Sequence, residues 1–224
     1  MAIVGLLNFK ADNEFYFDAV EQFSEQCRSV NLLINAKKTK EMVLSFSRTY
    51  AIYDYLFINS QPIEKAEHFK YLGTYFSHDL KWHENTCYTY KKLRARFYCF
   101  SKFKQFDPSK SQKHNFIETL ILPIFMYNIE LWYFSATQGN RDKLLRLFFK
   151  NTHFFDADSL VCRRIENTAK NFINFNTHIL NGCYSFGRKS YRMPKIKTER
   201  FLCSFIPTSI KVLNDMPLQS QSLS

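Results

Sequence analysis

Closely spaced carboxylates would be the first sign of nucleotidyl-transfer chemistry, because that chemistry uses two metal ions held between acidic side chains. The sequence contains no Asp-Asp pair. Four aspartates of the N-terminal part each stand alone: Asp12, Asp18, Asp54 and Asp79. We therefore expect no catalytic residues and no metal ligands, although a metal site assembled from distant acids stays open. No serine nucleophile motif or glycine-rich phosphate loop is present, so no cofactor and no small-molecule substrate are expected.

Histidine and cysteine side chains in the middle of the chain form a second candidate. His78, His83 and Cys87 follow one another at spacings of five and four residues. A zinc site needs a fourth ligand at suitable spacing, so positions at the surface or the core edge are the favoured interpretation. His78 and Asp79 are adjacent, which does not match the two-histidine, one-carboxylate triad of a mononuclear iron site.

A basic helical segment is the strongest positive signal. It carries four closely spaced cations: Lys91, Lys92, Arg94 and Arg96. Three tyrosines lie among or beside them: Tyr88, Tyr90 and Tyr98. This pattern predicts phosphate contacts from the cations and sugar or base contacts from the tyrosines. The alternative is a solvated face of a helical bundle.

The composition also favours a polyanionic partner. The 224 residues carry a formal net charge of +11. This charge favours nucleic acid as the partner first and an anionic membrane second, and the alternative is an ordinary basic protein with neither partner. The chain is 46% apolar and 17% aromatic, which is enough to bury a core. The six cysteines form no C-x-x-C pair, and neither a signal peptide nor an apolar run long enough for a membrane span is evident. We therefore expect an intracellular protein, cytoplasmic or nuclear, that makes no membrane contact.

The N-terminal part combines one helix with several short strands. Apolar periodicity predicts a helix over residues 14–29, capped by Asn13 and packed through Phe15, Val20 and neighbouring apolar positions. Strands are predicted at residues 2–7, 42–46, 52–63 and 69–76. Gly73 interrupts the last of these and marks a turn, a bulge or a close backbone approach. The prediction is one helix on a small antiparallel sheet.

Helical periodicity dominates from about His83 onward. The first helix should bury Leu93, Phe97, Phe100 and Phe103, which are favoured as core rather than as base-stacking platforms. In chain order, the sequence further predicts a helix start at Asp107-Pro108, a kink or interruption at Pro123, a break at Gly139-Asn140, a basic amphipathic helix over 141–155, a helix over 158–180, a cationic stretch over 188–200, a short helix or turn over 198–214 and a disordered tail. The fold class is thus α+β and predominantly α-helical, with domains at 1–80, 81–155 and 156–224.

Three blocks of this sequence resemble the reverse transcriptase of non-LTR (LINE-type) retrotransposons, from the end of the palm through the thumb. The first block contains Asn35 and Lys38-Thr39-Lys40-Glu41-Met42, similar to motif D. The second contains Phe69-Lys70-Tyr71-Leu72-Gly73, Trp82 and Lys91-Lys92, similar to the primer-grip turn and the start of the thumb. The third contains Lys197-Thr198, Arg200-Phe201, Ser204-Phe205-Ile206-Pro207 and Leu213-Asn214, similar to a segment near the end of such open reading frames.

The resemblance implies a set of nucleic-acid-binding positions. Lys38 and Lys40 would lie near the nucleotide, Lys70, Tyr71 and Gly73 near a primer end, and Lys91, Lys92, Arg94 and Arg96 along the duplex backbone. The expected partner is RNA or an RNA–DNA hybrid.

The same resemblance implies a lack of polymerase activity. The family's aspartate pair would precede the run that matches Ala2–Leu7, and neither it nor the magnesium ion it binds is expected here. We thus expect a truncated, catalytically inactive polymerase fragment, with a non-functional or purely structural transposon product as the alternative. A polymerase active with acids from a partner chain stays open. The segment Phe69–Trp132 also resembles the N-terminal region of an AlkB-type protein, whose dioxygenase and methyltransferase activities are not expected here.

Overall fold

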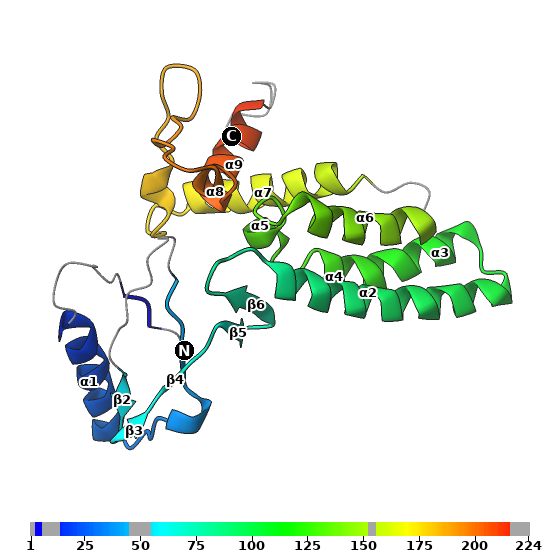
Figure 1. The fold of residues 1–224 in the computed structure, drawn as a ribbon. Coiled ribbons are helices and arrows are strands. Elements are labelled where there is room, and N and C mark those ends of the chain that lie inside the picture. Colours follow the sequence, from blue (N-terminus) through cyan, green and yellow to red (C-terminus); the bar gives the residue numbers. More distant parts are fainter. Residues whose placement is uncertain (1–2, 6–13, 45–54, 152–155, 216–224) are drawn as a thin grey trace. The chain divides into compact units, whose positions relative to one another are not determined.

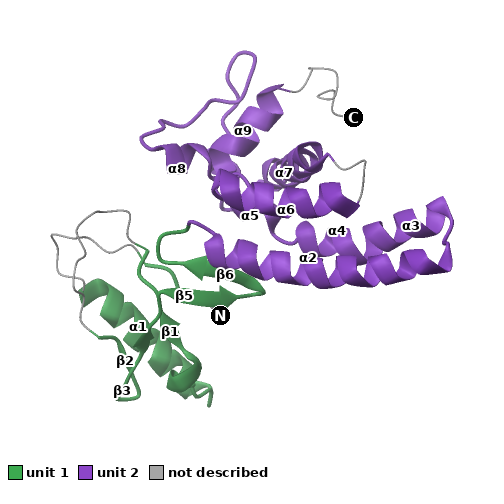
Figure 2. Cartoon of the chain, turned by 45° about the vertical axis from the view of Figure 1, so that its right-hand side comes forward, with its two compact units in different colours: residues 1–80 green, residues 81–224 purple. Residues whose placement is uncertain are grey.

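The fold is a predominantly helical α+β structure, as predicted (Figure 1). The computed structural model describes residues 3–5, 14–44, 55–151 and 156–215. The chain divides into two compact units, residues 1–80 and residues 81–224, which are called unit 1 and unit 2 below (Figure 2). Asn13, Asp12, Asp54 and the tail after Pro217 lie outside the described residues. The expected boundary between residues 155 and 156 stays a prediction.

Helix α1 of unit 1 spans Glu14–Ser29, the bounds predicted from periodicity. Val20 is buried at 4% exposure, and Tyr16 and Phe17 pack beside it. The assignment of Phe15 to the buried stripe was wrong, because its side chain is 86% exposed. At about 100° per residue, Tyr16 lies one turn before Val20 on the same face, whereas Phe15 lies well to the side.

The core of unit 1 lies between α1 and a short hairpin. Strand β2 (Phe57–Ile58) pairs antiparallel with β3 (Gln61–Pro62). Positive φ values at Asn59 (52°) and Ser60 (59°) turn the chain between them. The single strand expected over 52–63 is therefore a hairpin over its described part. The buried members of this core are Val20, Ala36, Leu56, Ile58 and Ile63.

The remaining strands of unit 1 form two further pairs. Strand β1 (Lys40–Glu41) runs parallel to β4 (Glu64–Lys65), and β5 (His68–Tyr71) runs antiparallel to β6 (Thr74–Ser77). Within the described residues, the one sheet we expected is thus three separate two-stranded sheets. Two strands were expected over 2–7 and 42–46. Their described parts, residues 3–5 and 42–44, are not strands, and their other residues lie outside the described part of the chain.

The turn between β5 and β6 explains the glycine within the aromatic strand pattern. Leu72 (φ 44°) and Gly73 (φ 85°) are its two central residues. Positive φ at both positions matches a type I′ hairpin turn, for which glycine is well suited and leucine is not. Of the three roles considered for Gly73, the turn is the one found.

Unit 2 begins with the long helix α2, His83–Phe103. Leu93, Phe97 and Phe100 are buried, as predicted. Phe103 is half-buried and stacks on Phe116, with ring centres 5.1 Å apart. The interpretation as core residues is therefore confirmed for Phe97 and Phe100, whereas Phe103 lies at the edge of the core.

The chain then returns along α2 through three helical segments (Figure 1). These are α3 (Lys110–Phe116), the π-helix η3 (Ile117–Ile121) and α4 (Leu122–Phe125), which contains Pro123. The expected helix start at Asp107-Pro108 was wrong. Asp107 has φ 48° and ends the 3₁₀ turn η2 (Lys104–Phe106), and α3 is capped by Ser109 instead. Ser109 and Gln112 form a reciprocal capping box, which satisfies two backbone N–H groups at the helix start.

Helix α5 (Ile129–Trp132) follows Asn128, and α6 spans Gln138–Asn151. The break expected at Gly139-Asn140 was wrong, because both residues lie in the first turn of α6. The chain bends one turn earlier, and the Thr137 carbonyl accepts from the Asn140 N–H at 3.0 Å. Glycine is tolerated at a helix start, where the first N–H groups have no helical partner. Phe125, Leu144 and Phe148 are fully buried at the centre of this bundle.

The last helices are α7 (Ala157–Asn174), α8 (Glu199–Leu202) and α9 (Phe205–Asp215). Helix α7 packs against α5 and α9. It ends six residues before the predicted limit at Leu180. The side-chain amide of Asn181 donates to the carbonyls of Phe172 and Ile173 at 3.2 and 2.9 Å, which caps the helix from outside. Within the described residues, no helix combines the length and apolar character needed to cross a membrane.

Candidate nucleic-acid interface

The positive charge of the chain belongs to unit 2. Residues 81–224 contain 23 Lys or Arg and 10 Asp or Glu, a formal net charge of +13. Residues 1–80 contain 8 and 10, a formal net charge of −2. A surface that attracts polyanions is therefore expected on unit 2.

The four predicted cations of α2 are all exposed, but they do not form one face. At about 100° per residue, Lys91, Lys92, Arg94 and Arg96 cover roughly 200° of the helix circumference. Lys92 and Arg96 lie on the flank that also carries Phe103, which stacks on Phe116 of α3. The Lys92 ammonium group lies 4.5 Å from the Tyr88 ring centre.

Helix α6 packs on the opposite flank of α2 and adds cations of its own. Phe97 and Phe148 meet edge to face, with ring centres 5.2 Å apart. The Lys143 ammonium group lies 4.8 Å from the Tyr90 ring centre. Arg94 follows Tyr90 by one helical turn, so it lies on the same flank as this contact.

Two helices thus build one basic surface, which we call the α2–α6 cationic face. Its exposed cations are Lys91, Arg94, Lys143, Arg146 and Lys150. Tyr90 and the 65% exposed Tyr98 lie among them. The sequence pattern identified Lys91 and Arg94, but the cations of α6 were noted only as part of an amphipathic helix. The cations of α2 and α6 share one surface because the two helices pack together, and residue spacing within one helix cannot predict that packing.

The site residues predicted in unit 1 fall on three local structures: the β5–β6 hairpin, the 3₁₀ turn η1 (Ala36–Lys38) and strand β1. Lys70, Tyr71 and Gly73 belong to the β5–β6 hairpin, where Lys70 lies opposite Tyr75 with its Nζ 5.5 Å from the ring centre. Lys38 closes η1, and its N–H donates to the Asn35 side chain at 3.2 Å.

Lys40 lies on β1, opposite Glu64 of β4, and forms an ion pair with it. This carboxylate neutralises Lys40, which weakens its value as a phosphate contact. With a net charge of −2, unit 1 offers no electrostatic support to the cations predicted there.

A second basic element of unit 2 is a hairpin-like turn over residues 185–192. Phe186 bridges Tyr191 in antiparallel register, and the Gly187 N–H donates to the Ser190 carbonyl at 2.7 Å. Arg188 and Lys189 form its exposed tip. The side chain of Asn214 on α9 donates to the Tyr191 carbonyl and accepts from the Tyr191 N–H, both at 2.9 Å.

The histidine and cysteine candidates are only partly brought together. Cys87 Sγ lies 3.6 Å from His83 Nε2 on the first turns of α2, whereas His78 belongs to unit 1. Among the described residues, no group of three or more His, Cys, Asp or Glu side chains could hold a metal ion. All six cysteines are free thiols.

Comparisons with known proteins identify no relative of this chain. No protein-family model, curated protein or solved structure matches the chain. The resemblance to non-LTR reverse transcriptases therefore stays a prediction from the three motif blocks. The charge and geometry of unit 2 are the structural features that bear on function.

Proposed function

We propose that this protein binds nucleic acid through the phosphate backbone, with the α2–α6 cationic face as the main contact surface. The observation that carries the proposal is the concentration of charge: +13 on unit 2 against −2 on unit 1. Cations that neutralise phosphates release bound counterions, which is the main source of sequence-independent affinity for nucleic acid.

The tyrosines favour nucleic acid over other polyanions. Tyr90 and Tyr98 lie among the cations of the face and offer ring surface to sugars or bases. A helix that lies on a membrane would need large aliphatic or aromatic residues along its outer side. The outward positions of α2 between Lys91 and Lys102 include Ala95 and Ser101, and Tyr98 is the one large ring exposed there.

The motif resemblance suggests the first nucleic acid to test. In a thumb-like module, cations of this kind would follow the backbone of an RNA–DNA hybrid. We propose a binding role derived from such a module, with no catalytic step assigned to any residue. Double-stranded RNA and single-stranded RNA are the natural comparison ligands.

The test is a salt titration of binding, measured by fluorescence anisotropy with a labelled RNA–DNA hybrid. Each phosphate contact contributes roughly 0.9 to the slope of log K against log salt on duplex DNA. The triple variant Lys91→Gln, Arg94→Gln, Lys143→Gln should therefore lower that slope by about 2 to 3 and weaken binding at low salt.

A matched variant separates a defined face from net charge. Lys110→Gln, Arg163→Gln, Lys211→Gln removes the same number of exposed cations from α3, α7 and α9. It should lower the slope by clearly less than the first variant. Equal effects of the two variants, or no binding by the wild-type protein at low salt, would refute the proposed face.

A further inference from the structure

The hairpin-like turn over residues 185–192 exposes an aromatic ring beside its cationic tip. Phe186 is 50% exposed, and the residues that follow it are Gly187, Arg188 and Lys189. The turn projects as a loop from the helices of unit 2 (Figure 1). Single exposed apolar side chains are common on protein surfaces. The support behind this ring and the charge around it are what distinguish it.

A row of rings supports Phe186 from the side of α9. Phe186 meets the Tyr191 ring edge to face, with ring centres 5.0 Å apart and planes at 82°. Tyr191 meets Tyr184 in the same way at 6.4 Å, and the Tyr184 hydroxyl shares a hydrogen bond of 2.8 Å with Ser209 of α9. In an edge-to-face pair, the partner covers at most one face of a ring. At least one flat face of Phe186 is therefore not covered by Tyr191.

The charge around this ring is positive. Residues 167–198 contain six Lys or Arg and no Asp or Glu. Arg188 and Lys189 are exposed at the tip. A Cβ atom at Gly187 would lie 3.6 Å from Cγ and Nε of Arg192, so the Arg192 side chain lies against the turn as well. Three cations thus belong to the turn that carries the exposed ring, and they attract phosphate groups to it.

We propose that an unpaired base of a single-stranded nucleic acid stacks on Phe186, while Arg188 and Lys189 contact the phosphates beside that base. The inference rests on the proposed function, because it gives a second contact to a nucleic acid held by unit 2. Bases inside a duplex are already stacked on both faces, so the open ring selects an unpaired base. Aromatic rings combined with cations are a common way to hold single strands without reading their sequence.

An anionic membrane is the other surface that cations and an exposed ring could meet. A segment that enters the membrane interface presents several large apolar side chains on the inserted side. The tip of this turn, residues 187–190, contains no aliphatic side chain. The tip therefore favours a hydrated phosphate backbone, and lipid vesicles serve as the competing ligand in the test.

The test compares an oligouridylate with an abasic strand of the same length, which carries the same phosphates without bases. Binding to the full chain is measured by fluorescence anisotropy at low salt. Phe186→Leu keeps an apolar side chain but removes the flat ring. It should weaken binding of the oligouridylate about fivefold or more, the effect of losing one base stack, and leave binding of the abasic strand unchanged.

Phe175→Leu is the matched control. Phe175 is 66% exposed at the end of α7 and lies outside the turn. This variant should bind both strands as tightly as the wild type. No effect of Phe186→Leu on the oligouridylate, or an equal effect of Phe175→Leu, would overturn the proposal.

The variant Phe186→Trp reports the stack directly. The two native tryptophans, Trp82 and Trp132, are buried, so the new indole would be the exposed one. A stacked base should quench its emission, whereas the abasic strand should bind without quenching. Equal quenching by the two strands would contradict stacking. A blue shift with vesicles of phosphatidylserine and phosphatidylcholine, without quenching by the oligouridylate, would assign the turn to a membrane instead.

The two proposals fail separately. The Lys91, Arg94, Lys143 triple variant should lower the salt slope for both strands and keep the preference for the oligouridylate over the abasic strand. Salt-dependent binding of the RNA–DNA hybrid, with no effect of Phe186→Leu on the oligouridylate, would refute the stacking site alone. A preference that Phe186→Leu removes, with equal effects of the two triple variants, would refute the cationic face alone.

Discussion

The ammonium group of Lys143 on α6 lies 4.8 Å from the centre of the Tyr90 ring on α2. This contact joins two helices that are far apart in the sequence and that also meet through the buried Phe97–Phe148 pair. The ring surface attracts the cation and holds it on the flank of α2 that carries Arg94 one helical turn further along. The α2–α6 cationic face is therefore a product of tertiary packing.

We expect Tyr90→Leu to lower the free energy of unfolding of unit 2 by about 0.5 to 1 kcal/mol beyond its packing loss, because it removes the aromatic partner of Lys143. A double-mutant cycle with Lys143→Met isolates that coupling in urea denaturation. Tyr90→Phe keeps the ring and should keep the coupling. A coupling free energy of zero for the Tyr90→Leu cycle would contradict this account.

Replacing Leu72 at the β5–β6 turn should stabilise unit 1. Leu72 holds φ 44° with a 71% exposed side chain, so it carries backbone strain without a large packing gain. Leu72→Asn should raise the free energy of unfolding by about 0.5 to 1 kcal/mol, because asparagine tolerates left-handed backbone. Gly73→Ala should lower it by about 1 kcal/mol. Leu33→Asn, at an exposed position without positive φ, is the control and should leave stability nearly unchanged.

Unit 1 should become less stable as the pH rises above the ordinary pKa of a glutamate. Glu41 is 7% exposed, and burial raises the pKa of its carboxyl above 4.5, against the opposing effects of Lys65 and the Tyr16 hydroxyl. Folding then favours the protonated acid, so its stabilising contribution is present below pH 4.5 and is lost as the pH rises through the raised pKa.

The variant Glu41→Gln should remove this pH dependence and raise stability at neutral pH. Urea denaturation between about pH 4 and pH 8 measures the effect. Glu25→Gln, at an exposed position of α1, should keep the wild-type profile. An unchanged profile for Glu41→Gln would show that this carboxyl does not control the pH response.

Loss of the α3 cap should weaken the start of the α3–α4 segment. Ser109→Ala removes the acceptor for the Gln112 N–H and should cost about 1 kcal/mol in thermal or urea denaturation. Ser111→Ala lies inside the same helix and should be neutral or slightly stabilising, because alanine is the better helix former. Equal losses for the two serines would contradict the capping box.

The neighbours Phe148 and Phe149 should differ sharply in their effect on stability. Phe148 is fully buried between Phe97 and Phe125, so Phe148→Ala should cost about 3 to 5 kcal/mol. Phe149 is 58% exposed, and Phe149→Ala should cost less than about 1 kcal/mol. Equilibrium denaturation of both variants tests the assignment of α6 faces.

Local signals predicted the parts of the fold that local forces determine. The bounds of α1 and the burial of Phe97 and Phe100 follow from apolar periodicity, and the turn at Gly73 follows from the backbone freedom of glycine. The errors at Asp107-Pro108 and Gly139-Asn140 have one cause. Each depended on a residue type that often ends or begins a helix, whereas α3 begins after its capping residue Ser109 and α6 begins after Thr137.

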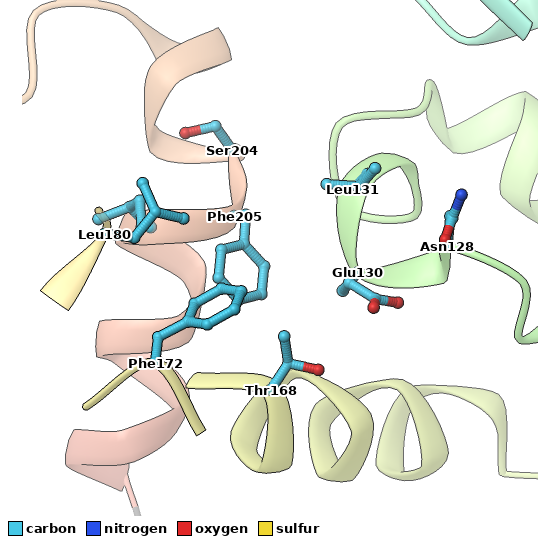
Figure 3. A pocket seen from close by; sticks show the side chains of 9 residues that line it. Asn128, Glu130, Leu131, Thr168, Phe172, Leu180, Ser204 and Phe205 are labelled. Carbon is cyan, nitrogen blue, oxygen red and sulfur yellow. The ribbon is translucent and has the colours of Figure 1, made fainter. Parts of the chain in front are cut away.

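The candidate sites were harder to predict because they combine distant segments. Helical periodicity was enough to predict that Lys91 and Arg94 are exposed. That Lys143 shares their surface could not be predicted, because it depends on how α6 packs on α2. An apolar pocket of unit 2 is lined by residues of α5, α7 and α9 and by Leu180 (Figure 3). No spacing in the sequence brings these segments together, so none of the pocket was predicted.

The double hydrogen bond between Asn214 and Tyr191 has an entropic consequence for the basic hairpin-like turn. An asparagine amide presents one donor and one acceptor, as a strand residue does, so it holds the Tyr191 backbone like a neighbouring strand. The long connection between η4 (Asn181–Cys183) and α8 is thereby divided into two shorter loops. Much of its conformational freedom is lost on folding, so Arg188 and Lys189 are preorganised and would lose less entropy when they meet an anionic partner.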